Sequence, residues 1–194
     1  PVGMEVDSNL LAGGGSRRFA RASSEAGGRK LLALWRGKPL FHWALDAVSP
    51  PPPHCRVLVV TREREIIAEA CRRGFLPVEA PPPDEGIAAS ARAGAAAARE
   101  GAALCFFVCD QPEFPRELFT RFVEGFCSSG LPLGRVRAGD RMGSPTAFRP
   151  ELRGELMALR GDEGGRALFR CREGETFFLE IPEECLEDLD MPWG

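Results

Sequence analysis

Leu11-Ala12-Gly13-Gly14-Gly15-Ser16-Arg17-Arg18 is the stretch on which the interpretation of this chain's fold and ligand depends. It follows an expected first strand over residues 4–11, and it precedes Lys30 and the run Gly37-Lys38-Pro39-Leu40. Glycines at the end of a strand leave backbone N–H groups free to turn toward an anion, while nearby basic side chains supply countercharge. The pattern indicates a nucleoside triphosphate ligand. The alternative interpretation is a flexible glycine turn beside solvated basic residues.

Two better-known phosphate-binding motifs do not fit this stretch. A dinucleotide fingerprint requires a third glycine where Arg18 stands. A P-loop ending at Lys38 requires glycine in place of Leu32 and serine or threonine in place of Pro39. The glycine run therefore belongs to a different kind of nucleotide site.

Strand and helix patterns alternate along the chain. Short β-rich runs occur at 57–61, 75–80, 104–109 and 176–181. Helical patterns occur at 40–48, 64–73, 88–99 and 117–126. This alternation predicts an α/β fold, with a mostly parallel central sheet covered by helices on both faces. The first strand is unusual, because Glu5, Asp7, Ser8 and Asn9 occupy a segment that should be apolar on both faces.

Length, charge and cysteine content favour one cytoplasmic domain. A chain of 194 residues with 44% hydrophobic content can bury one core, so we expect a single domain over residues 1–194. The net charge of -3, without a concentrated basic stripe, argues against nucleic acid as a partner. No apolar stretch approaches the roughly 20 residues of a membrane span, and no signal-peptide pattern is present. Seven cysteines without a Cys-x-x-Cys pair indicate reduced thiols.

Asp110 is the strongest candidate for a metal ligand. It ends the most apolar expected strand and opens Asp110-Gln111-Pro112, where the proline stops the strand. Ligands of open α/β sheets bind beyond the carboxyl ends of the strands. A carboxylate there can hold Mg²⁺, which takes one or two carboxylates together with phosphate oxygens and water. The alternative is an aspartate that only initiates a turn before proline.

Four further motifs follow one another along the chain. They are Gly86-Ile87-Ala88-Ala89-Ser90-Ala91-Arg92-Ala93-Gly94, Gly143-Ser144-Pro145, Gly161-Asp162-Glu163-Gly164-Gly165-Arg166 and Asp188-Leu189-Asp190-Met191-Pro192. The spacing of four places Gly86, Ser90 and Gly94 on one helix face. Small side chains there permit close approach of a base and ribose, or close helix packing.

The two later motifs carry carboxylates and an arginine. Asp162 can cap a helix whose N-terminus meets a phosphate, with Arg166 reaching the same anion, or it can be a plain cap. Asp188 and Asp190 would face the same side of an extended strand. Without further context these two belong to an acidic, solvated tail.

Together with the glycine run, Lys30 and Asp110-Gln111-Pro112, these motifs resemble the molybdenum cofactor cytidylyltransferase and NTP transferase family. The ordered set covers almost the whole chain. The resemblance implies a single-domain, Rossmann-like nucleotidyltransferase fold of the GT-A-like type. It also implies that a nucleoside monophosphate, CMP from CTP first of all, is transferred to molybdopterin with release of pyrophosphate.

The resemblance assigns a role to each motif. Asp110, Arg18 and Lys30 would be catalytic, and Asp110 and Asp190 would hold Mg²⁺, with Asp188 less favoured. The nucleotide would be bound by Leu11, Ala12, Gly13, Gly14, Gly15, Ser16, Arg18, Lys30, Gly86 and Ser90. The acceptor would be bound by Gly143, Asp162 and Arg166. A molybdoenzyme is the expected client protein.

The chain departs from the family pattern at several places. The loop between Arg18 and Lys30 is several residues longer than in the family, and Ser144 stands where the family has histidine. Gly13 stands where the cytidylyl branch usually has alanine, which resembles the guanylyl branch. Two alternatives therefore stay open: a transferase that uses GTP or another phosphorylated acceptor, and a binding or carrier protein that has lost turnover.

Overall fold

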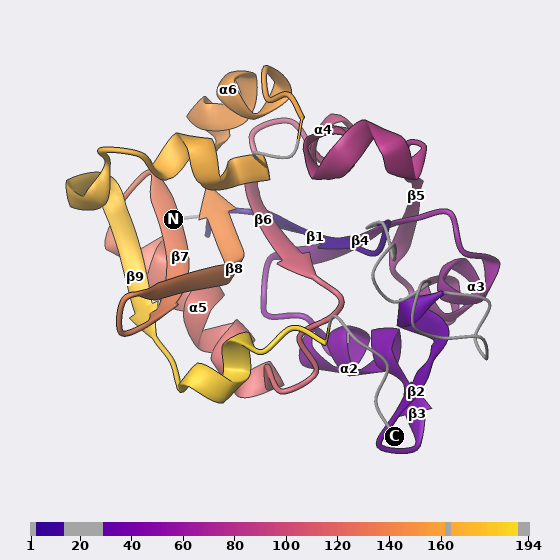
Figure 1. The fold of residues 1–194 in the computed structure, drawn as a ribbon. Coiled ribbons are helices and arrows are strands. Elements are labelled where there is room, and N and C mark those ends of the chain that lie inside the picture. Colours follow the sequence, from indigo (N-terminus) through magenta and orange to yellow (C-terminus); the bar gives the residue numbers. More distant parts are fainter. Residues whose placement is uncertain (1–2, 14–28, 162–163, 190–194) are drawn as a thin grey trace.

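The computed structural model describes residues 3–13, 29–161 and 164–189. A seven-stranded sheet in the order β5-β4-β1-β6-β8-β7-β9 forms its centre (Figure 1). The strands are β1 (Val6–Leu11), β4 (Cys55–Thr61), β5 (Leu76–Glu79), β6 (Ala103–Val108), β7 (Leu133–Ala138), β8 (Arg141–Phe148) and β9 (Thr176–Glu180). Strands β5, β4, β1 and β6 are parallel, β8 runs antiparallel to both β6 and β7, and β9 is parallel to β7.

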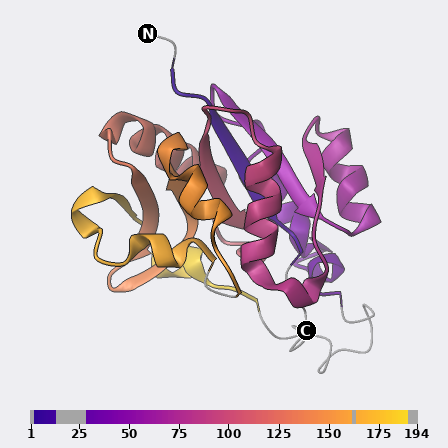
Figure 2. The same ribbon diagram turned by 90° about the horizontal axis from the view of Figure 1, so that it is seen from above.

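Helices cover both faces of the sheet. One face carries α2 (Leu40–Ala47), α3 (Arg64–Arg72) and α5 (Arg116–Ser129), and the other carries α4 (Gly86–Ala97), α6 (Arg153–Met157) and the 3-10 helix η4 (Gly164–Phe169). Figure 2 shows α4 and α6 together on the face toward the viewer. Alternate residues of β6 divide between the two cores: Phe107 packs with the α5 side, and Leu104 and Phe106 pack with the α4 side.

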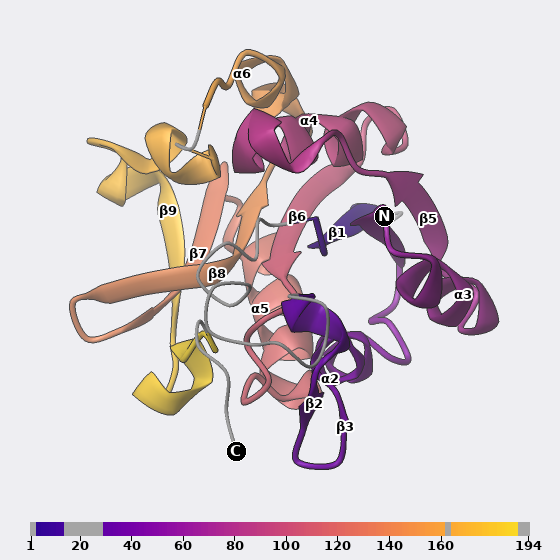
Figure 3. The same cartoon turned by 45° about the vertical axis from the view of Figure 1, so that its right-hand side comes forward.

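The remaining elements are short. A hairpin of β2 (Leu34–Trp35) and β3 (Lys38–Pro39) precedes α2 and projects from the body of the molecule (Figure 3). Five further 3-10 helices lie in the connections: η1 (Lys30–Leu32), η2 (Pro83–Glu85), η3 (Pro150–Leu152), η5 (Glu173–Glu175) and η6 (Glu183–Leu186). In the described part of the chain, no helix is both long and apolar enough to cross a membrane.

The α/β fold expected from the sequence is confirmed, and the eight expected runs correspond to β4, β5, β6, β9, α2, α3, α4 and α5. The sequence patterns did not predict the hairpin of β7 and β8. Its register shifts where Arg135 pairs with Thr146 and Val136 pairs with Gly143, so that Ser144 and Pro145 have no partner in β7. Such an irregularity is where a proline, which lacks an N–H, can occur within a sheet.

The polar first strand is buried, and its one carboxylate is bound by two arginines. The Asp7 carboxylate is fully buried. It accepts hydrogen bonds from Arg56 Nη2 at 2.9 Å, from Arg99 Nε at 2.9 Å and from the Arg99 backbone N–H at 2.6 Å. Burial alone would raise the pKa of Asp7, but the bonds from Arg99 and Arg56 outweigh that effect and hold it below the ordinary value of 3.8. The carboxylate therefore joins β1 to β4 and to the end of α4.

Asn9 fixes the distance between β1 and α4. Its Nδ2 donates to the carbonyls of Asp7 at 3.1 Å and Cys105 at 3.2 Å. A Cβ added at Gly94 would lie 2.5 Å from Asn9 Oδ1, so only glycine permits this approach of the helix. Close helix packing, one of the two interpretations of the Gly86–Ser90–Gly94 spacing, therefore accounts for Gly94.

Replacing Asp7 with asparagine should destabilise the protein by about 3 kcal/mol at pH 7, because two guanidinium groups lose their shared anion. Since the folded-state pKa of Asp7 is depressed, its contribution is complete above pH 3.8 and is lost as the pH falls through the folded-state value. Chemical denaturation should therefore show a smaller difference in unfolding free energy between Asp7→Asn and the parent at pH 3 than at pH 7. Glu5→Gln is the control, since the exposed Glu5–Arg99 pair contributes about 1 kcal/mol at most. Equal effects of the two substitutions would contradict this role for Asp7.

Replacing Gly94 with alanine should cost about 1–3 kcal/mol, because the new methyl group overpacks the buried contact with Asn9. Gly154→Ala in α6 is a matched control, since no atom lies within 4 Å of the added Cβ. Alanine is preferred to glycine in a helix by about 1 kcal/mol, so that variant should be at least as stable as the parent. Urea denaturation of both variants tests the spacing. A Gly94→Ala protein as stable as Gly154→Ala would show that Asn9 does not set it.

Candidate active site

The site lies at the carboxyl ends of the three central strands. Leu11, the last residue of β1, is in register with Val60 of β4 and Val108 of β6. The Ala12 N–H donates to the Val60 carbonyl at 2.9 Å, which extends the pairing one residue beyond β1. Ala12 therefore lies between the ends of β4 and β6, where open α/β sheets bind ligands.

The start of the glycine run meets the first half of α4. A Cβ added at Gly13 would lie 3.0 Å from the Ala80 Cβ and 3.5 Å from Ser90 Oγ. Ser90 is buried, and Gly86 begins α4 one turn earlier with a φ of +83° that favours glycine. The structure thus brings together Gly13 and Ser90, two of the residues expected to bind nucleotide, and Gly86 lies one helical turn before Ser90. Gly14, Gly15, Ser16 and Arg18 lie outside the described residues.

Lys30 and Asp110, which are 80 residues apart in sequence, form an ion pair at this edge. Lys30 Nζ donates to Asp110 Oδ2 at 2.8 Å. The lysine side chain is 10% exposed and the aspartate side chain 25% exposed, so the carboxylate still faces the open edge of the sheet. The long loop before Lys30 does not carry it away from the site.

Asp110 also meets the C-terminal segment. The Leu189 N–H donates to the Asp110 backbone carbonyl at 3.2 Å, which brings residue 188 to the same edge. Asp190, the expected second metal ligand, lies outside the described residues. No cluster of three or more metal-ligating side chains occurs within residues 3–13, 29–161 and 164–189. A carboxylate at a phosphate-binding edge nevertheless suits Mg²⁺, because this ion needs only one or two carboxylates when phosphate oxygens and water complete its shell.

Gln111 and Ser144 hold the end of β6 against the irregular part of β8. Gln111 Nε2 donates to the Ser144 carbonyl at 3.0 Å and to the Cys185 carbonyl at 3.2 Å. Ser144 Oγ accepts from the Val108 N–H at 3.0 Å. At the position where the related family has histidine, this chain therefore has a hydroxyl that satisfies a backbone group. Gln111 was not among the predicted site residues, although it lies inside the Asp110-Gln111-Pro112 motif.

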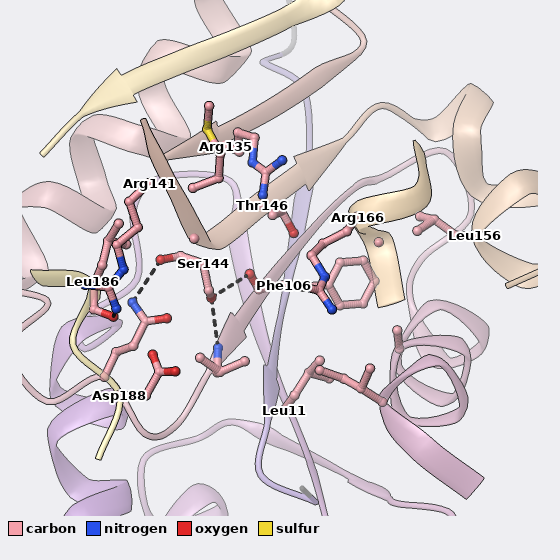
Figure 4. A pocket seen from close by; sticks show the side chains of 17 residues that line it. Leu11, Phe106, Arg135, Arg141, Ser144, Thr146, Leu156, Arg166, Leu186 and Asp188 are labelled. Atoms are coloured by element: carbon pink, nitrogen blue, oxygen red, sulfur yellow. Dashed lines mark hydrogen bonds between the residues drawn. The ribbon is translucent and has the colours of Figure 1, made fainter. Parts of the chain in front are cut away.

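A cavity of about 420 Å³ opens beside this edge and extends over β8 toward η4 (Figure 4). Its lining includes Leu11 and Gln111 near the end of β6, and Gly143 and Arg166 farther along. Gly143 and Arg166 are two of the three residues expected to bind acceptor. The third, Asp162, lies outside the described residues. Arg135, Arg141 and Asp188 also line the cavity, and neither arginine was singled out by a sequence motif.

The fold matches several solved structures over almost the whole chain. Rv0371c from Mycobacterium tuberculosis superposes with a TM-score of 0.75 at 22% identity, covering 96% of this chain and 94% of that one. A nucleotidyl transferase from Methanothermobacter gives a TM-score of 0.75 at 20% identity, covering 96% and 92%. Molybdopterin-guanine dinucleotide biosynthesis protein A from Archaeoglobus fulgidus gives 0.65 at 15% identity, covering 96% and 93%. Rv0371c has also been crystallised with manganese. At these identities the likeness establishes the fold.

A search of curated proteins found no significant sequence match. The family model described as the MobA-like NTP transferase domain matches residues 9–177. That match begins within β1 and ends within β9, so it includes the glycine run, Asp110 and most of the residues that line the cavity. Because it spans most of the 194 residues, the chain belongs to the MobA-like NTP transferase domain family.

Proposed function

We propose that residues 1–194 act as one nucleotidyltransferase domain that transfers CMP from CTP to a phosphate of molybdopterin and releases pyrophosphate. The Lys30–Asp110 pair carries this proposal, because it puts a cation and a carboxylate together at the sheet edge. Gly13 and Ser90 meet at the same edge, and the acceptor-sized cavity opens beside it. Membership of the NTP transferase family supports the reaction class.

The proposed reaction requires positioning and charge neutralisation rather than a covalent enzyme intermediate. An acceptor phosphate oxygen attacks the α-phosphorus of the nucleotide in line, and the bond to the pyrophosphate leaving group breaks. Backbone amides of the glycine run would cradle the triphosphate. Lys30 and Arg18 would neutralise its charge. Gly86 and Ser90 would leave room for the base and ribose beside Gly13.

Asp110 and Asp190 would hold Mg²⁺, which supplies charge stabilisation to the reacting phosphates when it is bound. Gly143, Asp162 and Arg166 would meet the acceptor. A cytoplasmic location and a molybdoenzyme client complete the proposal.

The motifs support cytidine more than guanine. Asp110-Gln111-Pro112 and the Gly161–Arg166 motif are nearer the cytidylyl branch of the family, while Gly13 resembles the guanylyl branch. A GTP-dependent transferase is therefore the second candidate. The carrier alternative drew on the polar first strand, and the bonds of Asp7 to Arg56 and Arg99 now explain that strand as packing. Pyrophosphate release separates the candidates, since a carrier binds nucleotide without releasing any.

Calorimetric titration with CTP, GTP, UTP and ATP in the presence of Mg²⁺ should show CTP binding most tightly, by about tenfold or about 1.4 kcal/mol over GTP. Pyrophosphate release should follow the same order when acceptor is added. Tighter binding of GTP would replace the cytidylyl assignment with the guanylyl one. Equally weak binding of all four, without pyrophosphate release, would favour the carrier.

Asp110→Asn should preserve the fold and most nucleotide affinity, and it should lower pyrophosphate release by at least about 100-fold. Asparagine keeps the volume and turn-forming tendency of aspartate, so a purely structural Asp110 would tolerate the change. Glu124→Gln on the exposed side of α5 is a carboxylate-to-amide control and should retain full activity. An Asp110→Asn enzyme within a few fold of the parent would make Asp110 a turn residue.

A further inference from the structure

Arg135 and Arg137 are two arginines of β7 that differ in their countercharge. They lie two residues apart, and each guanidinium stacks on a phenylalanine: Arg135 on Phe169 at 4.4 Å and Arg137 on Phe178 at 4.3 Å. Arg137 forms an ion pair with Glu180. Arg135 has no carboxylate partner among the described residues, and its buried Nε has no hydrogen-bond acceptor there. A buried guanidinium donor without an acceptor is costly, and an anionic ligand in the cavity would supply one.

A second guanidinium, that of Arg166, lines the same cavity (Figure 4). Gly165 permits this placement, because a Cβ there would lie 2.8 Å from Phe148 Cζ and would push η4 away from the sheet. No ion pair of Arg166 is found in the part of the chain that the structure describes. Burial, together with the charge of Arg166, lowers the pKa of Arg135 from its ordinary value. Two cations that share a cavity repel each other until an anion lies between them.

This pair of arginines is separated from the reacting end of the site. Arg135 belongs to β7, which lies two strands from β6, and that places its backbone about 10 Å across the sheet from β6. Across the sheet, Arg135 pairs with Thr146 of β8, and Thr146 pairs with Phe106 of β6. Asp110 lies four residues after Phe106, beyond the end of β6. The cavity that joins the two regions is lined by both polar and apolar side chains, among them Ser144, Thr146 and Phe106. A phosphate reacting beside Asp110 and an anion held by Arg135 are therefore different groups.

We propose that Arg135 and Arg166 bind a second acidic group of the acceptor, distinct from the phosphate that reacts beside Asp110. This inference rests on the proposed acceptor role of the cavity, and it specifies the substrate class: a phosphomonoester that carries a second anionic group. Arg135 is then a specificity-determining residue. Acceptors with a single anionic group leave its Nε without an acceptor.

Three probes that share a six-carbon chain test the inference by calorimetry on the full chain. They are hexane-1,6-diol bisphosphate, 6-(phosphonooxy)hexanoate and 6-hydroxyhexyl phosphate, which differ only in the far group. Each of the first two should bind at least about tenfold more tightly than the third, a difference of about 1.4 kcal/mol. The relative affinities of the first two probes show whether the arginines prefer a phosphate or a carboxylate at the far end. Equal affinities of all three probes would overturn the proposal.

Substitutions of single arginines test whether Arg135 and Arg166 cause the preference for the doubly anionic probes. Arg135→Gln should abolish the preference for the doubly anionic probes, and Arg137→Gln, the matched arginine already paired with Glu180, should keep it. Arg166→Gln gives an independent reading if the Arg135 variant fails to fold. An equal loss in Arg137→Gln would show only general electrostatic attraction and would overturn the site. The nucleotide titrations report separately on the proposed transferase function, because probe selectivity requires neither nucleotide binding nor turnover.

Discussion

The buried carboxylate of Asp7 is the interaction on which the arrangement of the site depends. It binds Arg56 of β4 and Arg99 just beyond α4, so one anion joins two strands and a helix at the amino end of the sheet. Asn9, two residues later on the same face of β1, sets the closest approach of α4 at Gly94. One turn earlier in the same helix, Ser90 lies beside Gly13. The spacing of the nucleotide edge is therefore set partly by charges at the far end of the same strand.

The candidate site has two chemically different parts. The edge formed by β1, β4 and β6 gathers glycine, lysine and aspartate, which suits phosphates and a hard cation. The cavity over β8 and β7 combines apolar surface with Arg135, Arg141 and Arg166. Gln111 joins them, because its side chain binds backbone carbonyls of β8 and η6 while its neighbour Asp110 faces the edge. Such a division is what a two-substrate reaction requires: one region for the common nucleotide and another for the acceptor.

The sequence predicted the elements whose side chains follow a regular period. Periodicity in the sequence predicts the apolar strands β4 and β6 and the amphipathic helices α3 and α5, because their buried side chains recur at a regular spacing. The position of Asp110 was predictable for a related reason: a residue that follows an apolar strand of a parallel sheet lies at the carboxyl edge of that sheet. The β7–β8 hairpin was missed because Gly143 and Pro145 interrupt the alternation within β8, and Arg135 of β7 is one basic residue among many in the sequence.

Contacts between distant segments could not be predicted in the same way. Nothing local to Lys30 indicates Asp110 as its partner, and nothing local to Asp7 indicates two arginines that are 49 and 92 residues away. The polar first strand contradicted the expected pattern for a central strand until those partners were known. Its burial shows that a carboxylate can occupy the centre of a parallel sheet when guanidinium groups arrive from neighbouring elements to neutralise it.

The ion pair between Lys30 and Asp110 also bears on the order in which ligands bind. Under the proposed assignment, the ammonium group occupies one oxygen of the carboxylate that would hold the cation. A divalent ion that arrives alone must displace the Lys30 ammonium group from this carboxylate oxygen. An ion arriving with a triphosphate offers that lysine new oxygens, so the exchange becomes favourable. Nucleotide and cation then raise each other's affinity by the same factor, as linkage requires. Under the proposed assignment, the protein therefore binds the divalent ion more tightly together with the nucleotide than alone.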